Sequence, residues 1–201
     1  MSVPFEFVAN DERETDRFGA ALAQVLPSGA VVALVGTLGA GKTRLVQAVA
    51  KAAGVDPSEV LSPTFVLVHE YRVPGFRRGG HAQFRVQAQK NQSDVDTTAN
   101  QKSGETRSQL PVPVIYHIDA YRIRDDDEFR ELGPEEYFES DGWTFIEWAD
   151  RVSDCLPREH LEINIAVTGL ATRRFGVVAH GRTPGNALTR LSSLLERLSA
   201  S

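Results

Sequence analysis

The sequence is short of cysteine, of long apolar runs and of positive charge. Its single cysteine, Cys155, has no intrachain disulfide partner, and no stretch approaches the roughly 20 apolar residues that a membrane helix needs. The N-terminal stretch MSVPFEFVANDERE lacks the basic start and apolar block of a secretion signal. These absences predict a cytoplasmic protein with no membrane span.

The net charge also excludes one class of function. The chain carries 22 Lys and Arg residues against 27 Asp and Glu residues, a formal charge of −5. A protein that binds nucleic acid through its own surface is expected to be basic. If nucleic acid matters here, we expect another protein to hold it.

Several conspicuous side chains have an ordinary explanation. The histidines are not at metal-ligand spacing, so each is expected to be a surface or hydrogen-bonding residue. Cys155 is expected to pack, Trp148 to lie in the core or stack, and Arg122 and Arg124 to face solvent. The histidines are His69, His81, His117, His160 and His180.

The stretch GTLGAGKT, residues 36–43, carries the clearest chemistry. It matches the phosphate-binding loop (P-loop) pattern Gly-x-x-x-x-Gly-Lys-Thr, follows an apolar strand and precedes a helix. Its backbone N–H groups are expected to hold phosphate oxygens, Lys42 to contact the β and γ phosphates, and Thr43 to bind Mg²⁺. The sequence has no Asn-Lys-x-Asp guanine motif, so ATP is the expected nucleotide.

Apolar spacing around this loop predicts the fold. The chain is expected to form one domain over residues 1–201, of the α/β class: a P-loop NTPase-like three-layer sandwich with a central mixed sheet, parallel near the P-loop and antiparallel at one edge. A capping box of Asp11 and Glu14 is expected to start the first helix. Strands are expected over 5–9, 31–35, 64–71, 112–119, 143–148, 160–167 and 173–180, and helices over 11–26, 43–53, 125–132, 134–140 and 183–198.

A polar segment separates two of these strands. Residues 74–113 are poor in large apolar side chains and rich in Gln, Ser, Thr and Gly. Such a composition cannot bury enough surface to offset the entropy of ordering. We predict a flexible insertion at a hairpin tip, roughly 20 Å from the chemistry at about 3.3 Å per strand residue.

Two acids at strand ends are candidates for metal binding or water activation. Glu147 closes WTFIE, which is the better Walker B pattern, and Asp119 closes VIYHID. The carboxyl ends of strands are where an α/β sheet places its ligands. The alternatives are a strand-end turn for Asp119 and a salt-bridged or capping acid for Glu147.

The SPT stretch, Ser62 to Thr64, is expected near Asp119. If the strands over 64–71 and 112–119 pair as a hairpin, Thr64 and Asp119 share one of its ends. Ser62 and Thr64 then lie where a switch-like loop would sense the γ-phosphate. Taken alone, SPT is also typical of a plain turn.

The set GTLGAGKT, SPTFVLVHEY, YHIDAYR, ELGPEEYF and IEWAD resembles the TsaE family, the ATPase of tRNA threonylcarbamoyladenosine (t6A) biosynthesis. The order and spacing match over most of the chain, apart from the insertion. The resemblance implies an ATPase that works with two partner proteins, TsaD and TsaB, and meets tRNA only through them. Its ATP cycle would reset or regulate that complex.

The resemblance also implies roles for single residues. Thr43 and Glu147 would hold Mg²⁺, Asp119 would support metal or water, and Glu12 would contact the nucleotide. The phosphates would be held by the loop residues Gly36, Gly39, Ala40, Gly41, Lys42, Thr43 and Arg44.

Two features depart from the family pattern. Family members commonly have an acid at the second loop position, where this chain has Thr37. The insertion is also foreign to the pattern. A small-molecule P-loop kinase remains the alternative, with Arg77, Arg78 and Arg85 of the insertion as its lid, and a nucleotide-gated binding module is a third possibility.

Overall fold

The computed structural model describes residues 5–63, 67–74 and 114–199 of the chain. In chain order the elements are β1 (Phe5–Ala9), α1 (Glu12–Val25), β2 (Val31–Val35), α2 (Lys42–Ala52), η1 (Pro57–Glu59), β3 (Val68–Arg72), β4 (Val114–Asp119), α3 (Asp126–Glu131), α4 (Pro134–Phe138), β5 (Trp143–Glu147), η2 (Ala149–Cys155), β6 (His160–Val167), β7 (Arg173–His180) and α5 (Arg182–Ser199). None of the described helices combines the length and apolarity of a membrane span.

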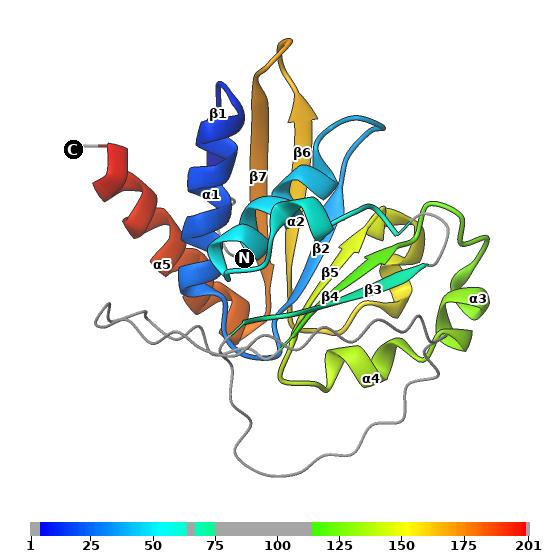
Figure 1. Cartoon of the computed structure of the whole chain (residues 1–201). Helices are drawn as coiled ribbons and strands as arrows, with labels where there is room; N and C mark the ends of the chain where they lie inside the picture. Colours follow the sequence, from blue (N-terminus) through cyan, green and yellow to red (C-terminus); the bar gives the residue numbers. More distant parts are fainter. Residues whose placement is uncertain (1–4, 64–66, 75–113, 200–201) are drawn as a thin grey trace, which may run out of the picture.

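One seven-stranded sheet runs through the molecule in the order β1-β7-β6-β2-β5-β4-β3 (Figure 1). The central strand β2 is parallel to both neighbours, β5 and β6, and β4 is parallel to β5. The remaining pairs, β1 with β7, β6 with β7 and β3 with β4, are antiparallel. The predicted α/β fold class is confirmed, and antiparallel strands lie at both edges of the sheet rather than at one.

Helices cover the two faces of this sheet with separate cores (Figure 1). Because side chains alternate along β2, Val32 and Leu34 pack with α1, α2 and α5, whereas Val31 and Ala33 pack with α3, α4 and η2. We call these the α1 face and the α3 face. A strand buried on both faces needs a continuous apolar run, which VVALV supplies.

The predicted capping box at the start of α1 is present with one difference. The Asp11 side chain accepts a hydrogen bond from the Glu14 backbone N–H at 2.8 Å. The Glu14 carboxylate reaches back to the N–H of Asn10, one residue before the cap. The Asp11 side chain therefore satisfies one of the free N–H groups at this helix end, and α1 begins where the sequence predicted.

The strand predicted over 64–71 begins later than expected. Leu67 has a left-handed backbone (φ 65°), which no strand residue adopts, and β3 starts at Val68. Thr64 lies outside the described residues, as does the predicted insertion from residue 75 to residue 113. The pairing of Arg72 with Val114 places the flanks of that segment at the end of the hairpin opposite Asp119. The assignment of 1–201 to one domain stays a prediction.

Candidate nucleotide site

The P-loop connects the end of β2 to the start of α2. Gly41 precedes α2 with a left-handed backbone (φ 105°), a conformation that a side chain would strain. The eleven-residue helix α2 then directs its first N–H groups at the loop. The loop therefore lies at the carboxyl end of the central parallel strand, where α/β sheets bind ligands.

Lys42 lies across the loop and against an aromatic ring. Its Nζ donates hydrogen bonds to the carbonyl oxygens of Gly36 at 2.8 Å and Thr37 at 3.1 Å. The same Nζ lies 3.6 Å from the ring centroid of Trp148, a cation–π contact. Burial lowers the pKa of Lys42, and the nearby carboxylate of Glu147 opposes that shift.

Thr43 and Glu147 meet although they are 104 residues apart in the sequence. The Thr43 hydroxyl donates a hydrogen bond of 2.6 Å to Glu147 Oε1. His117 Nε2 lies 2.7 Å from the same oxygen, and since a carboxylate accepts, Nε2 carries the proton. Glu147 is only 3% exposed, so its orientation is fixed by these two partners.

Asp119 lies beside Glu147 on the neighbouring strand. The two acids are register partners of the parallel β4–β5 pair, and Asp119 is buried. Its Oδ2 accepts a hydrogen bond of 2.8 Å from the Ser62 hydroxyl, and its Oδ1 accepts one of 2.9 Å from the Tyr121 N–H. The predicted proximity of the SPT stretch to Asp119 therefore holds for Ser62.

Arg44 and Glu12 lie at the margin of this site. Arg44 Nε is 3.7 Å from the Glu12 carboxylate, whose side chain is 84% exposed. Arg44 also donates to Asp16, which accepts a second hydrogen bond, of 2.9 Å, from Lys51. Burial acts to raise the pKa of Asp16, but these two cations outweigh it and lower that pKa.

Three participants at the site were not predicted from sequence. His117 was expected only as a surface or hydrogen-bonding histidine, yet it is buried and bonded to Glu147. The ring of Trp148 contacts Lys42, and the Trp148 backbone is left-handed (φ 58°). Asp16 accepts a hydrogen bond from Arg44. The available signal for His117 was its position in the YHID strand, two residues before Asp119, because alternate strand residues share a face.

The fold and the loop geometry agree with a comparison against protein families. The model of the family "Threonylcarbamoyl adenosine biosynthesis protein TsaE" matches residues 9–104 and 103–175 of this chain. The chain belongs to the TsaE family.

Individual TsaE proteins are similar over most of their length. Three relatives are each named "tRNA threonylcarbamoyladenosine biosynthesis protein TsaE". The protein from Synechocystis sp. is 32% identical over 73% of this chain and 71% of its own length. The Aquifex aeolicus protein is 31% identical over 77% of this chain and 84% of its own length. The Bacillus subtilis protein is 30% identical over 84% of this chain and 81% of its own length. The resemblance predicted from the motifs is thereby confirmed.

A solved structure supports the fold of this TsaE-family chain. The crystal structure of Bacillus subtilis YdiB aligns with a TM-score of 0.65 and covers 96% of this chain and 97% of its own. Its sequence identity is 23%, so it supports the architecture alone. The exposed Thr37 contributes its backbone carbonyl to Lys42.

Proposed function

We propose that this TsaE-family protein is a Mg²⁺-dependent ATPase of tRNA t6A biosynthesis. The observation that carries the proposal is the contact of the Thr43 hydroxyl with the buried Glu147 carboxylate at the carboxyl end of the sheet. A P-loop hydroxyl and a strand-end acid at one point are the pair that binds the Mg²⁺ of a nucleotide in P-loop NTPases.

The residues at this site suit both the Mg²⁺ ion and the phosphates of Mg²⁺-ATP. Mg²⁺ prefers oxygen donors, and Thr43, Glu147 and Asp119 supply them. The loop N–H groups and the Lys42 ammonium suit phosphate oxygens. Thr43 and Glu147 would hold a Mg²⁺ ion, which would supply positive charge against the negative charge that develops on the phosphates.

The protein groups have distinct roles in this proposal. Lys42 leaves the carbonyl oxygens of Gly36 and Thr37 for the β and γ phosphates, while Trp148 limits where its ammonium can lie. His117 holds the Glu147 carboxylate in place. Asp119, held by Ser62, orients the attacking water or a water on the metal. The partially exposed Arg44 and the exposed Glu12 border the nucleotide.

The enzymatic part is tested by substitution at Glu147. Glu147→Gln is expected to keep ATP binding and to lower the hydrolysis rate by at least about 100-fold, the scale of losing a charge that stabilises a transition state. Glu139→Gln, on the exposed surface near the end of α4, is the matched control and is expected to leave the rate unchanged. Equal rates in Glu147→Gln and the parent protein would refute the role of Glu147.

The biological part concerns partners. We propose that ATP hydrolysis resets or regulates a complex of TsaD and TsaB that modifies adenosine 37 of tRNA, and that tRNA is met only through these partners. The net charge of −5 supports indirect contact with tRNA. Turnover is expected to be slow alone and faster with TsaD and TsaB, measured on the co-purified mixture. Unchanged turnover, together with partner binding that ATP does not strengthen, would refute this part.

A further inference from the structure

Two histidines and a glutamate gather on the α3 face of the sheet, away from the nucleotide site. His160 begins β6, His180 ends β7, and the two are paired directly across the antiparallel β6–β7 ladder. Glu162 lies two residues after His160 and shares its face of the strand. Each of the three offers one ligand atom, and these atoms all lie within 4.8 Å of one another.

Hydrogen bonds to other residues engage one polar atom each of His160 and Glu162. The second polar atom of each side chain keeps a lone pair with which to bind a shared ligand. His160 Nδ1 lies 2.7 Å from the carbonyl oxygen of Pro157 and must donate to it, which leaves Nε2 as the acceptor of the neutral ring. Metal-binding histidines usually have their second ring nitrogen bonded in this way. Glu162 Oε1 accepts a hydrogen bond of 2.6 Å from the Asn164 side-chain amide, which leaves Oε2 to face His180.

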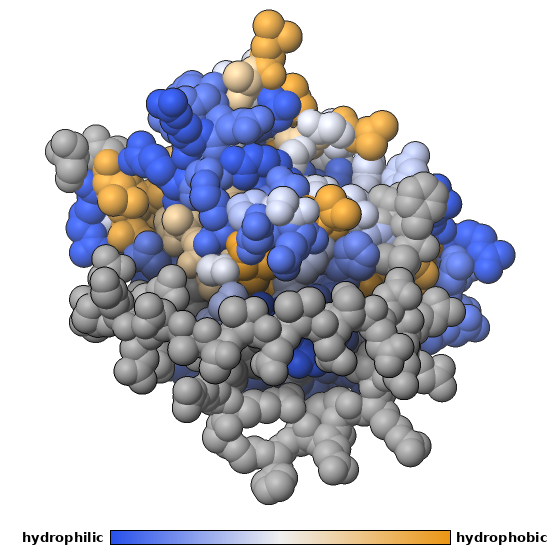
Figure 2. All heavy atoms as spheres, viewed as in Figure 1, coloured by the Kyte–Doolittle hydropathy of each residue, from blue (hydrophilic) through white to orange (hydrophobic). Residues whose placement is uncertain are grey.

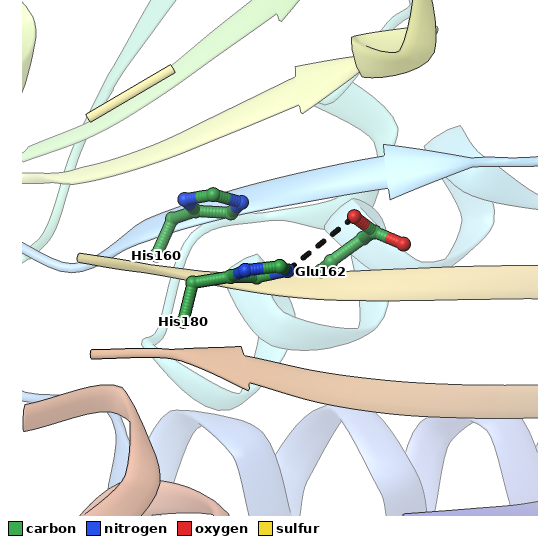
Figure 3. Close-up of side chains that lie close together, drawn as sticks. All are labelled: His160, Glu162 and His180. Atoms are coloured by element: carbon green, nitrogen blue, oxygen red, sulfur yellow. Dashed lines mark ion pairs between the residues drawn. The ribbon is translucent and has the colours of Figure 1, made fainter. Parts of the chain in front are cut away.

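One ring nitrogen at this cluster has no hydrogen bond of its own. His180 Nε2 is buried and has no hydrogen-bond partner among the described residues, although it lies 3.5 Å from Glu162 Oε2. His160 is 9% exposed, and its ring stacks on that of His180, with centroids 4.2 Å apart (Figure 3). Burial also lowers the pKa of His160, which favours the neutral, metal-binding form.

We propose that His160, Glu162 and His180 form a site for a first-row transition-metal ion such as Zn²⁺. Imidazole nitrogen and carboxylate oxygen are ordinary zinc ligands at about 2.0–2.2 Å, so tetrahedral ligand atoms lie about 3.4 Å apart. The His180–Glu162 separation of 3.5 Å already meets that spacing. Rotation of the partly exposed His180 and Glu162 side chains would bring the third atom into range.

The proposed ion is distinct from nucleotide-bound Mg²⁺. Glu147 follows Trp143 and Phe145 on the α1 face, whereas His160 and Glu162 alternate with Leu161, which packs on that face. The cluster also lies at the strand ends opposite the P-loop, since Leu161 pairs with Val32 and the loop follows Val35. Three protein ligands leave a fourth position for water or for an incoming ligand.

The direct test is metal titration of the full, untagged chain with Zn²⁺ and, for its visible absorption, Co²⁺. Excess Mg²⁺ is present to occupy the Thr43–Glu147 site. The parent protein is expected to bind one equivalent, and His180→Asn and Glu162→Gln are each expected to weaken binding by at least about tenfold. His69→Asn and Cys155→Ser, which change potential ligands outside the cluster, are expected to bind as the parent does.

The controls separate loss of the site from loss of the fold. ATP binding by His180→Asn and Glu162→Gln is expected to match the parent, because neither residue touches the P-loop. If His180→Asn does not fold, Glu162→Gln alone decides the question. No saturable binding of Zn²⁺ by the parent, or equal affinity in Glu162→Gln, would overturn the proposal.

Discussion

At the scale of single residues, two backbone conformations beside the site are ones that side chains rarely adopt. Among the described residues, Leu67 and Trp148 are the non-glycine positions with positive φ, at 65° and 58°. The Leu67 carbonyl accepts from the Asp119 N–H at 3.0 Å, and Trp148 directly follows Glu147. Each conformation costs of order 1–3 kcal/mol and persists where the surroundings enforce it. The two strained residues therefore lie next to Asp119 and Glu147.

His117 provides the sharpest prediction at this scale. His117→Leu removes the donor to Glu147 and is expected to lower ATP hydrolysis by about 10–100-fold with little change in ATP affinity. His117→Gln, whose Nε2 is able to replace the lost donor, is expected to keep most of the activity. The measurement is steady-state hydrolysis beside equilibrium ATP binding; equal losses in both variants would show that His117 acts only through packing.

At the scale of elements, the closest helix contact is between α1 and α2. A Cβ added at Gly19 would lie 2.5 Å from Ala48 Cβ and 2.9 Å from the Ala48 carbonyl carbon, so only glycine fits there. The same two helices are joined by the bonds of Asp16 on α1 to Arg44, in the first turn of α2, and to Lys51, in its last turn. The register of α1 against α2 therefore positions Arg44 at the start of α2.

Gly19→Ala is expected to push these helices apart. We expect the free energy of unfolding to fall by about 1–3 kcal/mol, despite the better helix propensity of alanine. Gly185→Ala, on α5 where an added Cβ meets nothing within 4 Å, is the matched control and is expected to be neutral or stabilising. Urea unfolding of both variants measures the difference, and an equal response at the two positions would contradict the close packing.

Asp16 gives the α1–α2 contact a pH dependence. The folded-state pKa of Asp16 is lowered below the ordinary value of 3.8. Its contribution to the free energy of unfolding is therefore complete above that value and is lost as pH falls through the lower folded-state pKa. Asp16→Asn is expected to cost about 0.5–1 kcal/mol at pH 7, a surface-pair magnitude.

Urea unfolding at pH 7 and at about pH 3 measures this dependence. The deficit of Asp16→Asn is expected to shrink at the lower pH, which lies below the ordinary pKa of 3.8, because folding must then remove a proton from the carboxyl. Asp154→Asn, at an exposed position on η2, serves as the control for removing one surface charge. A deficit that is the same at both pH values would contradict the ion-pair account.

At the scale of the whole molecule, one sheet separates the two proposed sites. The proposed nucleotide site lies on the α1 face at the carboxyl ends of the parallel strands. The cluster of His160, Glu162 and His180 lies on the α3 face at the opposite ends. On the face shown in Figure 2, hydrophobic groups are dispersed among hydrophilic ones. Leu170, in the turn between β6 and β7, is fully exposed, and Val167, the last residue of β6, is half exposed.

Nucleotide binding is expected to stabilise the whole fold, because the site joins β2, α2, β4 and β5. Mg²⁺-ATP at about 100 times its Kd would raise the free energy of unfolding by about 2.7 kcal/mol. Lys42→Ala is expected to lose most of this stabilisation, and Arg190→Ala, on the exposed side of α5, to retain it. Thermal unfolding with and without Mg²⁺-ATP provides the measurement, and an equal shift in both variants would exclude Lys42 from the binding site.

The order of elements was predictable because it depends on local patterns. The apolar run VVALV, the Asp11 cap and the glycine-rich loop each encode their structure within a few residues. The late start of β3 was not predictable, because the apolar stretch from Phe65 continues the strand pattern and gives no sign of the left-handed Leu67.

The sequence alone determined that a glycine-rich loop with the P-loop pattern follows a buried strand, and that acids end two other strands. Only the tertiary structure decided that Thr43 meets Glu147, that His117 holds the same carboxylate, and that Lys42 lies against Trp148. It likewise brought together His160, the first residue of β6, and His180, the last residue of β7, at the open end of their hairpin. The reason is physical: spacing along a chain fixes which face a residue occupies, whereas strand order and register fix its neighbours across the sheet.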